Sequence, residues 1–293
     1  GLTSITSAIA GLAVSPLVKR IGLTGTLMGT GMMLLLSLAA SSVAYNIATK
    51  HGFEPKDRSK ATKMSTKKEE TGMIQKATSL FSRVPVLKAL FFEILGSQGL
   101  ATVLNICFMD RLGTAITDDD KRAGWVGKYY SLINLITMVL QFGVLPPLMT
   151  MIEPRDMWRV LPLVSLATTG YQAFQKDPSL YTVSASLLVM KVSEYSARRM
   201  LDEMIFVPLD FESRFVGKEV IGVFGYRFGK SLMSLLLSVL TALDGNLSLQ
   251  KQSFFAYMVC FVWMKTAWDL SNMVPSREEA ETAHLKEKRR SSR

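Results

Sequence analysis

The segment RFVGKEVIGVFGYRFGKSLMSLLLSVL, residues 214–240, decides the fold because it combines the length of a membrane span with fixed charges. About 20 predominantly apolar residues are enough to cross the hydrocarbon core of a bilayer. Lys218, Arg227 and Lys230 stand in the first part of the segment, and a cation at the membrane centre costs about 3 kcal/mol. The segment therefore predicts a membrane helix whose cations are shielded by protein, by water or by the bilayer surface.

The sequence does not contain the motifs of an enzyme or a metal site. GYRFGKS, residues 225–231, is one residue shorter than the GxxxxGK[ST] phosphate loop, and no strand pattern precedes it. Cys107 and Cys260 each lie inside an apolar run, and His51 and His284 lie far apart in polar segments. These residues make neither a disulfide framework nor a metal-ligand set. We therefore expect no catalytic residue, no metal, no cofactor and no enzymatic activity.

Composition and charge indicate an integral membrane protein. The chain has 293 residues, 48% of them hydrophobic, with a mean hydropathy of +0.24 and a net charge of +10. Because the basic residues concentrate in loops beside apolar runs, they favour the positive-inside pattern of membrane proteins over nucleic-acid binding. Gly1 in place of Met indicates a chain that is processed, truncated or only partly defined at its start.

Apolar runs and charged stretches divide the chain into four parts. We expect two membrane helices in residues 1–49, a basic linker in 50–83, a six-helix membrane bundle in 84–275 and a charged tail in 276–293. Six crossings place the linker and the tail, which are both net positive, on the same face, as the positive-inside rule requires. The spans of the bundle are expected at about 85–109, 125–150, 157–175, 180–199, 218–242 and 253–274.

Gly25 and Gly29 form a GxxxG pair in the apolar run Ile21–Ile47. Such a pair permits close contact with another membrane helix. Small residues are, however, simply frequent in membrane helices, and the sequence leaves both interpretations open.

A stripe of charge follows the fourth span of the bundle. Lys191, Glu194, Arg198 and Asp202 recur at helical spacing and so share one face of a helix. Such a face cannot point at lipid, and it must face a water-filled cavity, a protein partner or solvent beyond the bilayer. We expect Glu194 and Arg198 to form ion pairs, and Lys191 and Glu203 to line a substrate-binding cavity.

Arg227 and Lys230 lie three residues apart and therefore share a face of their helix. Together with Lys218 they fit a site for phosphate or another anion in a central cavity. The alternative is that they snorkel to the interface or pair with carboxylates such as Glu194 or Glu203. The residues alone do not decide between these two interpretations.

Two further charged positions have simpler interpretations. Lys265 and Asp269 are spaced i, i+4 in the last span, and we expect them to neutralise each other as an ion pair. Glu93 is a lone acid early in the first span after the linker. It has the chemistry of a coupling or partner group, but its position near the membrane edge favours no role in a site.

The stretch DEMIFVPLDFESRFVGKEVIGVFGYRFGKS, residues 202–231, resembles the signature of the non-mitochondrial ATP/ADP translocases, the nucleotide transporters of plastids and of intracellular bacteria. VGKYYS, residues 126–131, and PLVKRIG, residues 16–22, are weaker matches to other motifs of these transporters. The residues of the long stretch that match the signature are Glu203, Met204, Pro208, Leu209, Asp210, Gly217, Lys218, Gly225, Arg227, Gly229, Lys230 and Ser231.

The resemblance implies a fold related to the major facilitator superfamily, with two helical halves around a central cavity. This chain would supply the last two helices of the first half and the complete second half. The implied function is ATP/ADP exchange, with Lys218, Arg227 and Lys230 holding the phosphates. We therefore expect an all-α polytopic, major-facilitator-like protein of a plastid or other organellar membrane, with lipids and anionic nucleotides as partners.

A second function stays open. Phe108 stands where the family pattern has an acidic residue, and the sequence lacks the first helices of the family fold. Both features suit a transporter-derived structural subunit of a larger photosynthetic or respiratory membrane complex. The partners of such a subunit would be other membrane proteins of that complex.

Overall fold

A computed structural model describes residues 2–52, 73–245, 247–276 and 279, and all regular secondary structure in these ranges is helical. Most of the expected linker and most of the tail lie outside the described residues. The elements, in chain order, are α1 (Leu2–Lys50), α3 (Met73–Arg83), α4 (Pro85–Ala115), α5 (Asp119–Val139), η1 (Leu140–Val144), α6 (Leu145–Met151), α7 (Pro154–Ala173), α8 (Leu180–Ser193), η2 (Glu194–Arg198), α9 (Arg199–Phe206), α10 (Phe211–Val220), η3 (Ile221–Phe228), α11 (Gly229–Asp244) and α12 (Leu249–Ser271).

Four helical stretches of the described chain are long and apolar enough to cross a membrane. They are Thr6–Lys50, Pro85–Ala115, Asp119–Met151 and Ser213–Leu243. The all-α polytopic membrane class predicted from the sequence is thereby confirmed. The division into four parts and the six-span topology of the bundle stay predictions.

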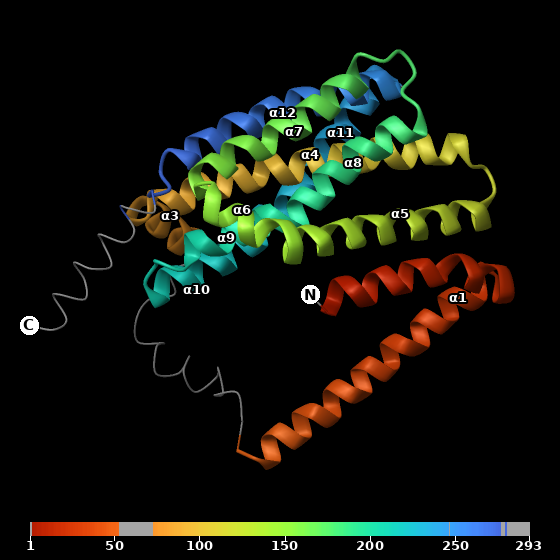
Figure 1. The fold of residues 1–293 in the computed structure, drawn as a ribbon, viewed down its shortest axis with the longest axis horizontal. Helices are drawn as coiled ribbons and strands as arrows, with labels where there is room; N and C mark the ends of the chain where they lie inside the picture. The colour runs from red at the N-terminus through yellow and green to blue at the C-terminus, as the bar shows by residue number, and fades with distance from the viewer. Residues whose placement is uncertain (1, 53–72, 246, 277–278, 280–293) are drawn as a thin grey trace, which may run out of the picture.

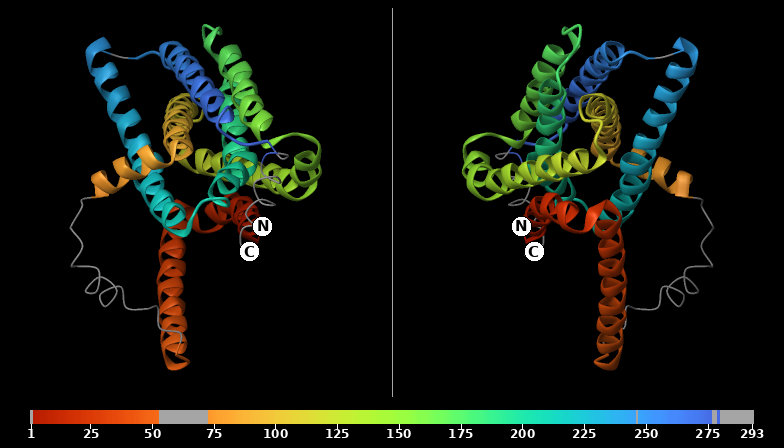
Figure 2. Two further views of the ribbon diagram at one scale, coloured as in Figure 1. Left: turned by 90° about the vertical axis from the view of Figure 1, so that its left-hand side faces the viewer. Right: turned by 90° about the vertical axis from the view of Figure 1, so that its right-hand side faces the viewer.

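Helix α4 forms the centre of the bundle (Figures 1 and 2). It packs against α12, α8, α11 and η3. Its side chains therefore supply much of the apolar core, and Leu100, Leu104 and Leu112 are almost fully buried. Near the other end of α4, Leu87, Leu90 and Ile94 pack into a second buried cluster that includes residues of α9 and η3.

Helix α1 is broken at Gly22, whose φ of 71° is outside the helical range. The part before the break packs closely on α5, because a Cβ at Gly127 would lie only 2.7 Å from the carbonyl oxygen of Gly11. The Ser131 hydroxyl donates a hydrogen bond to the carbonyl oxygen of Ala8 at 2.8 Å in the same contact. Small residues thus allow two backbones to approach, as is common between membrane helices.

The part of α1 after Gly22 has no comparable partner. It points away from the bundle in both views of Figure 2, and nothing lies within 4 Å of a Cβ built at Gly29. The close contact that the Gly25–Gly29 pair permits is therefore not formed in this structure. The large side chains of this part that are exposed include Leu27, Met28, Met32, Met33, Leu34, Leu35, Leu36 and Leu38.

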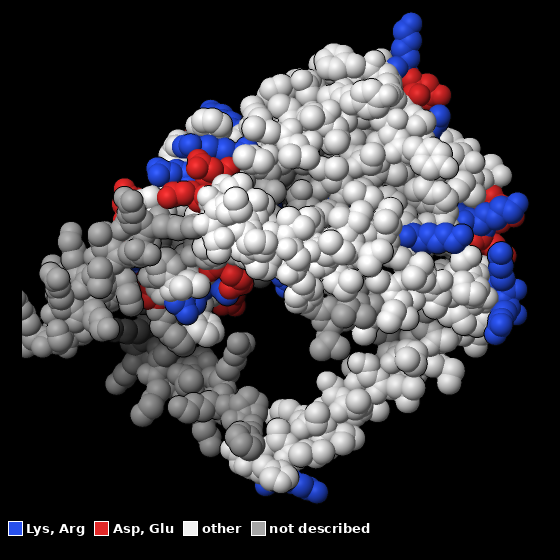
Figure 3. Space-filling view, viewed as in Figure 1, with Lys and Arg blue, Asp and Glu red and all other residues white. Residues whose placement is uncertain are grey.

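Charged side chains gather at the two ends of the molecule on the face shown in Figure 3. One end carries α3, α9 and α10, and the other carries the turns between α4 and α5 and between α7 and α8 and the break in α1. The far end of α1 also carries basic side chains. The band between these ends is almost free of charge on this face. An apolar band between two charged ends is the surface that a bilayer requires.

Candidate functional site

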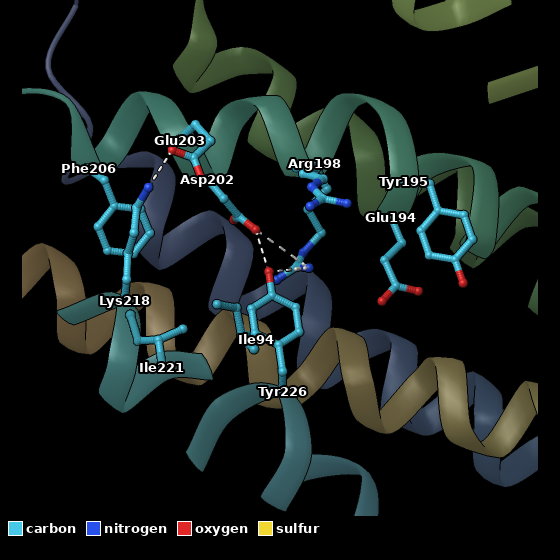
Figure 4. Close-up of a pocket in the computed structure, with 11 residues that line it drawn as sticks. Ile94, Glu194, Tyr195, Arg198, Asp202, Glu203, Phe206, Lys218, Ile221 and Tyr226 are labelled. Atoms are coloured by element: carbon cyan, nitrogen blue, oxygen red, sulfur yellow. Dashed lines mark hydrogen bonds and ion pairs between the residues drawn. The ribbon is translucent and has the colours of Figure 1, made fainter. Parts of the chain in front are cut away.

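A cavity of about 360 Å³ lies between α4, the η2–α9 segment and the α10–η3 segment. Its wall combines a few apolar side chains with many charged ones (Figure 4). Ile94 comes from α4, Asp202 from α9 and Tyr226 from η3. The volume falls within the ordinary range of small-molecule sites, about 300 to 1,000 Å³.

Both charged walls of the cavity contain a stretch of π-helix. These stretches are η2 and η3, and in both the helix is wider than an α-helix. Such stretches shift the side chains that follow relative to a regular helix, and they are frequent at functional sites. Here they place Arg198 and Tyr226 opposite each other, with the guanidinium carbon 5.6 Å from the centre of the tyrosine ring.

Glu93 and Arg198 form a buried ion pair behind this wall. Their side chains are 0% and 1% exposed. The Arg198 Nε and Nη2 atoms donate to the two carboxylate oxygens of Glu93 at 3.0 and 2.7 Å. The indole Nε1 of Trp263 donates to Glu93 Oε1 at 2.7 Å. The expectation that Glu93 has no role in a site was wrong, because Arg198 of η2 and Trp263 of α12 bind its carboxylate from two sides.

Asp202 joins the same cluster with fewer contacts. The Tyr226 hydroxyl donates to its Oδ2 atom at 2.6 Å, and Arg198 Nη1 lies 3.9 Å from that oxygen. The Oδ1 atom is buried and has no hydrogen-bond partner. Asp202 therefore presents an unused acceptor in the wall of the cavity.

A second buried ion pair continues the charged stripe. Lys191 Nζ lies 2.9 Å from Glu194 Oε2, and the Gln98 amide donates to Glu194 Oε1 at 2.9 Å. Glu194 lines the cavity, but Lys191 does not. Sequence reasoning assigned Lys191 to substrate binding, whereas the structure places it in the ion pair that holds Glu194.

Lys218 and Glu203 stand at an exposed part of the cavity wall. Their charged atoms are 2.6 Å apart, and the two side chains are 43% and 62% exposed. Arg199 also lines the cavity. Within the part of the chain that the structure describes, Arg199 forms no ion pair, so its charge is available to a ligand. Sequence reasoning missed Arg199, which lies next to the stripe but not on it.

Arg227 and Lys230 lie outside the cavity lining and are exposed. Neither forms an ion pair with Glu194 or Glu203, so the pairing that the sequence left open is not formed. Lys230 follows Tyr226 by four residues and therefore lies on a similar side of the helix, one turn further along.

Lys265 and Asp269 are both exposed on α12, and no ion pair joins them. The predicted neutralisation between them is therefore not formed. A lysine that precedes its acid by four residues is the less favourable order on a helix, and each side chain here extends into its surroundings alone.

Phe108 is fully buried in a core cluster separate from the one beside the cavity. Its ring stacks on Tyr129, with 4.9 Å between the centroids, and lies 5.7 Å from Trp125. The position where the resemblance has an acid is thus part of an aromatic core. No charged group replaces that acid at this point of α4.

These features define an all-α polytopic membrane protein with a charged internal cavity. Residues 179–273 match the family model described as TLC ATP/ADP transporter. The match supports the ATP/ADP translocase family that the sequence predicted, over the segment that it covers. Neither the curated proteins nor the solved structures gave a match to the chain. Every residue that lines the cavity, except Ile94, lies within the matched segment.

Proposed function

We propose that the protein binds ATP and ADP in this cavity and exchanges one for the other across the membrane. The observation that carries the proposal is the coincidence of the cavity with the family match. Residues 194–226 supply ten of its eleven lining side chains, and the match extends over residues 179–273. The part of the sequence that resembles nucleotide transporters is therefore the part that encloses space for a ligand.

Lys218 and Arg199 are the cations best placed to hold phosphates. An exposed ion pair such as Lys218–Glu203 contributes about 0 to 1 kcal/mol to stability, so Lys218 can exchange its carboxylate for a phosphate oxygen at little loss. Arg199 has no carboxylate to release. Its planar guanidinium can bind two oxygens of one phosphate group.

Arg227 and Lys230 would extend the cationic surface beyond the cavity. Both are exposed on a stretch that is apolar enough to span a membrane. Cations on such a helix need water or protein beside them. We propose that they face a water-filled approach to the cavity, so that an incoming nucleotide meets them before Lys218.

The two buried ion pairs have a positioning role in this proposal. Arg198 is held by Glu93, and Lys191 holds Glu194. These contacts fix the side of α8–α9 that forms the cavity wall. We do not assign direct phosphate contacts to Lys191, because its ammonium is committed to Glu194 and lies outside the cavity lining.

The test is the exchange of labelled ADP by the protein in liposomes loaded with ATP. Lys218→Ala and Arg199→Ala should each reduce the exchange about tenfold or more, because a charge-assisted hydrogen bond to phosphate contributes at least about 1.5 kcal/mol. Arg227→Ala and Lys230→Ala should reduce it as well. Lys265→Ala is the matched control, because Lys265 is an exposed cation of α12 outside the cavity. Unchanged exchange in the Lys218 and Arg199 variants would overturn the proposal.

We place the protein in a plastid or other organellar membrane, with the linker and the tail on the positive-inside face. The support is the excess of basic residues in these two segments and the nucleotide-transporter family. Cysteine labelling from each side of the intact membrane, at Ser65 and at Ser291, would test the orientation.

The alternative function is a structural subunit of a membrane complex that no longer transports. The aromatic packing of Phe108 favours it, because a buried core residue occupies the position where the family pattern has an acid. Purification in mild detergent distinguishes the two functions. A structural subunit would co-purify in fixed ratio with other membrane proteins and would not bind ADP.

A further inference from the structure

The buried cluster beside the cavity contains two carboxylates and one guanidinium. Glu93 and Asp202 both lie within ion-pair distance of Arg198, and among the described residues no other cation lies within 4 Å of either carboxylate. All three side chains are at least nine-tenths buried. If both acids were ionised, the cluster would hold one uncompensated negative charge away from water, and such a group usually neutralises instead.

The hydrogen bonds show which of the two acids is neutral. Glu93 receives two N–H groups from Arg198 and one from Trp263, which is the environment of an ionised carboxylate. Asp202 receives one hydroxyl, from Tyr226, and its contact with Arg198 is 3.9 Å long. Its Oδ1 atom has no hydrogen-bond partner in the part of the chain that the structure describes. A proton on Oδ1 would leave Oδ2 free to accept from Tyr226, so the geometry suits the neutral acid.

A proton fits this position better than a metal ion. In the described parts of the chain, no group of three or more His, Cys, Asp or Glu side chains could hold a metal. The guanidinium of Arg198 would also repel a cation bound at Asp202. A proton needs only the one unused oxygen that the structure provides.

We infer that Asp202 carries a proton on Oδ1 at neutral pH, and that at a higher pH, where the empty cavity has lost this proton, binding of an anionic nucleotide is coupled to its uptake from solvent. The coupling rests on the proposed function, whereas the protonated Asp202 does not. On ionisation the proton leaves Oδ1 for water, and on ligand binding it returns. No other bond changes.

The charged groups around Asp202 determine whether a bound ligand favours or opposes its protonation. Glu93 of α4 and Glu203 of α9 oppose its ionisation, while Arg198 of η2, Arg199 of α9 and Lys218 of α10 favour it. Tyr226 of η3 donates to its other oxygen. A phosphate near Lys218 would add negative charge and offset that lysine, so an occupied cavity should favour the protonated acid.

The same proton changes the charge of the cavity wall. Arg198, Arg199 and Lys218 line it together with Glu194, Asp202 and Glu203, so the wall is neutral when all six are ionised. With Asp202 protonated, the wall carries a net charge of +1.

The proton itself can be tested without any nucleotide. The infrared spectrum of the purified protein at neutral pH should show the carbonyl stretch of a buried, protonated carboxyl group, and Asp202→Asn should remove it. Asp269→Asn, a change of an exposed acid on α12, should leave it in place. Glu93→Gln is the second variant, because it removes the excess negative charge. In that variant Asp202 should ionise beside Arg198, and the band should disappear although Asp202 is present.

The coupling is tested by the affinity for ADP as a function of pH. The wild-type affinity should fall as pH rises, by up to about tenfold per pH unit where Asp202 titrates. Asp202→Asn imitates the neutral acid, so it should bind ADP with the low-pH affinity of the wild type at every pH, while Asp269→Asn should follow the wild type.

The outcomes separate the inference from the proposed function. A band that persists in Asp202→Asn overturns the protonated Asp202, and a band that persists in Glu93→Gln overturns the excess negative charge as the cause of the protonation. ADP binding that depends on pH to the same extent in wild type and Asp202→Asn overturns the coupling and leaves nucleotide binding intact. A wild type that does not bind ADP overturns the proposed function and the coupling together. The infrared experiment still tests the protonation of Asp202 in that case, because it uses no nucleotide.

Discussion

The charged stripe of residues 191–202 and the apolar helix of residues 23–50 show the opposite of what is usual in soluble proteins. There, charged side chains are exposed and large apolar side chains are buried. The charged members of the stripe, Lys191, Glu194, Arg198 and Asp202, are all buried. The apolar side chains of the helix are exposed, and Met28 and Leu35 are 70% and 67% exposed. In water this arrangement would be unfavourable in both places. In a bilayer it is expected, because lipid solvates apolar side chains and charges must be shielded by protein.

The largest loss of stability among the changes in the stripe is expected from a substitution of Arg198. Arg198→Ala leaves Glu93 as a buried carboxylate without a cation, and such a change costs about 3 to 5 kcal/mol. We expect unfolding in detergent at a clearly lower temperature or urea concentration than for the wild type.

Arg199→Ala is the control for this change, because Arg199 is the next residue but is exposed and unpaired within the described residues. It should change the free energy of unfolding by less than about 0.5 kcal/mol. Equal losses from the two substitutions would show that the buried ion pair does not stabilise the fold.

Substitutions of two leucines compare how much a buried and a lipid-exposed apolar side chain contribute to stability. Leu104→Ala removes a fully buried side chain of α4 and should cost about 2 to 5 kcal/mol. Leu35→Ala removes a side chain of the exposed helix and should cost less than about 0.5 kcal/mol. Chemical unfolding in the same detergent measures both. A large loss from Leu35→Ala would mean that another surface of the chain covers this helix.

The smallest expected effect concerns two glycines, Gly127 of α5, which contacts α1, and Gly29 of α1. Gly127→Leu would force the start of α1 away from α5, because its Cβ would lie within 3 Å of two atoms of α1. The loss should be about 1 to 3 kcal/mol. The distance between spin labels on Ile9 and Leu132 should lengthen in this variant.

Gly29→Leu is the matched control, since nothing lies within 4 Å of the position of its new Cβ. It should leave both stability and label distance unchanged. The opposite ranking, with Gly29→Leu the more damaging, would show that the GxxxG pair makes a contact after all.

The fold class could be predicted because it depends on local composition. Apolar runs of membrane length appear in the sequence at the candidate spans of the structure, such as Pro85–Ala115 and Ser213–Leu243. The break in α1 lies next to Ile21, where the second apolar run of the sequence begins. The structure keeps Pro16 inside the helix and breaks it at Gly22, because only the glycine can readily adopt a positive φ.

The site could be predicted only in part, because its partners are far apart in the chain. The shared face of Lys191, Glu194, Arg198 and Asp202 follows from their spacing. The pairing of Arg198 with Glu93, across 105 residues, does not, since periodicity within a helix says nothing about which neighbour it meets. The π-helical stretches η2 and η3 also left no signal in the sequence, although they determine which side chains reach the cavity.

The most direct test of the central claim is to locate bound nucleotide with a photoreactive ADP analogue. The protein in lipid nanodiscs is labelled, digested and analysed by mass spectrometry. We expect the label on peptides from residues 194–226, which line the cavity, and we expect unlabelled ADP to prevent the labelling. Label confined to other parts of the chain, or labelling that excess ADP does not reduce, would contradict the account.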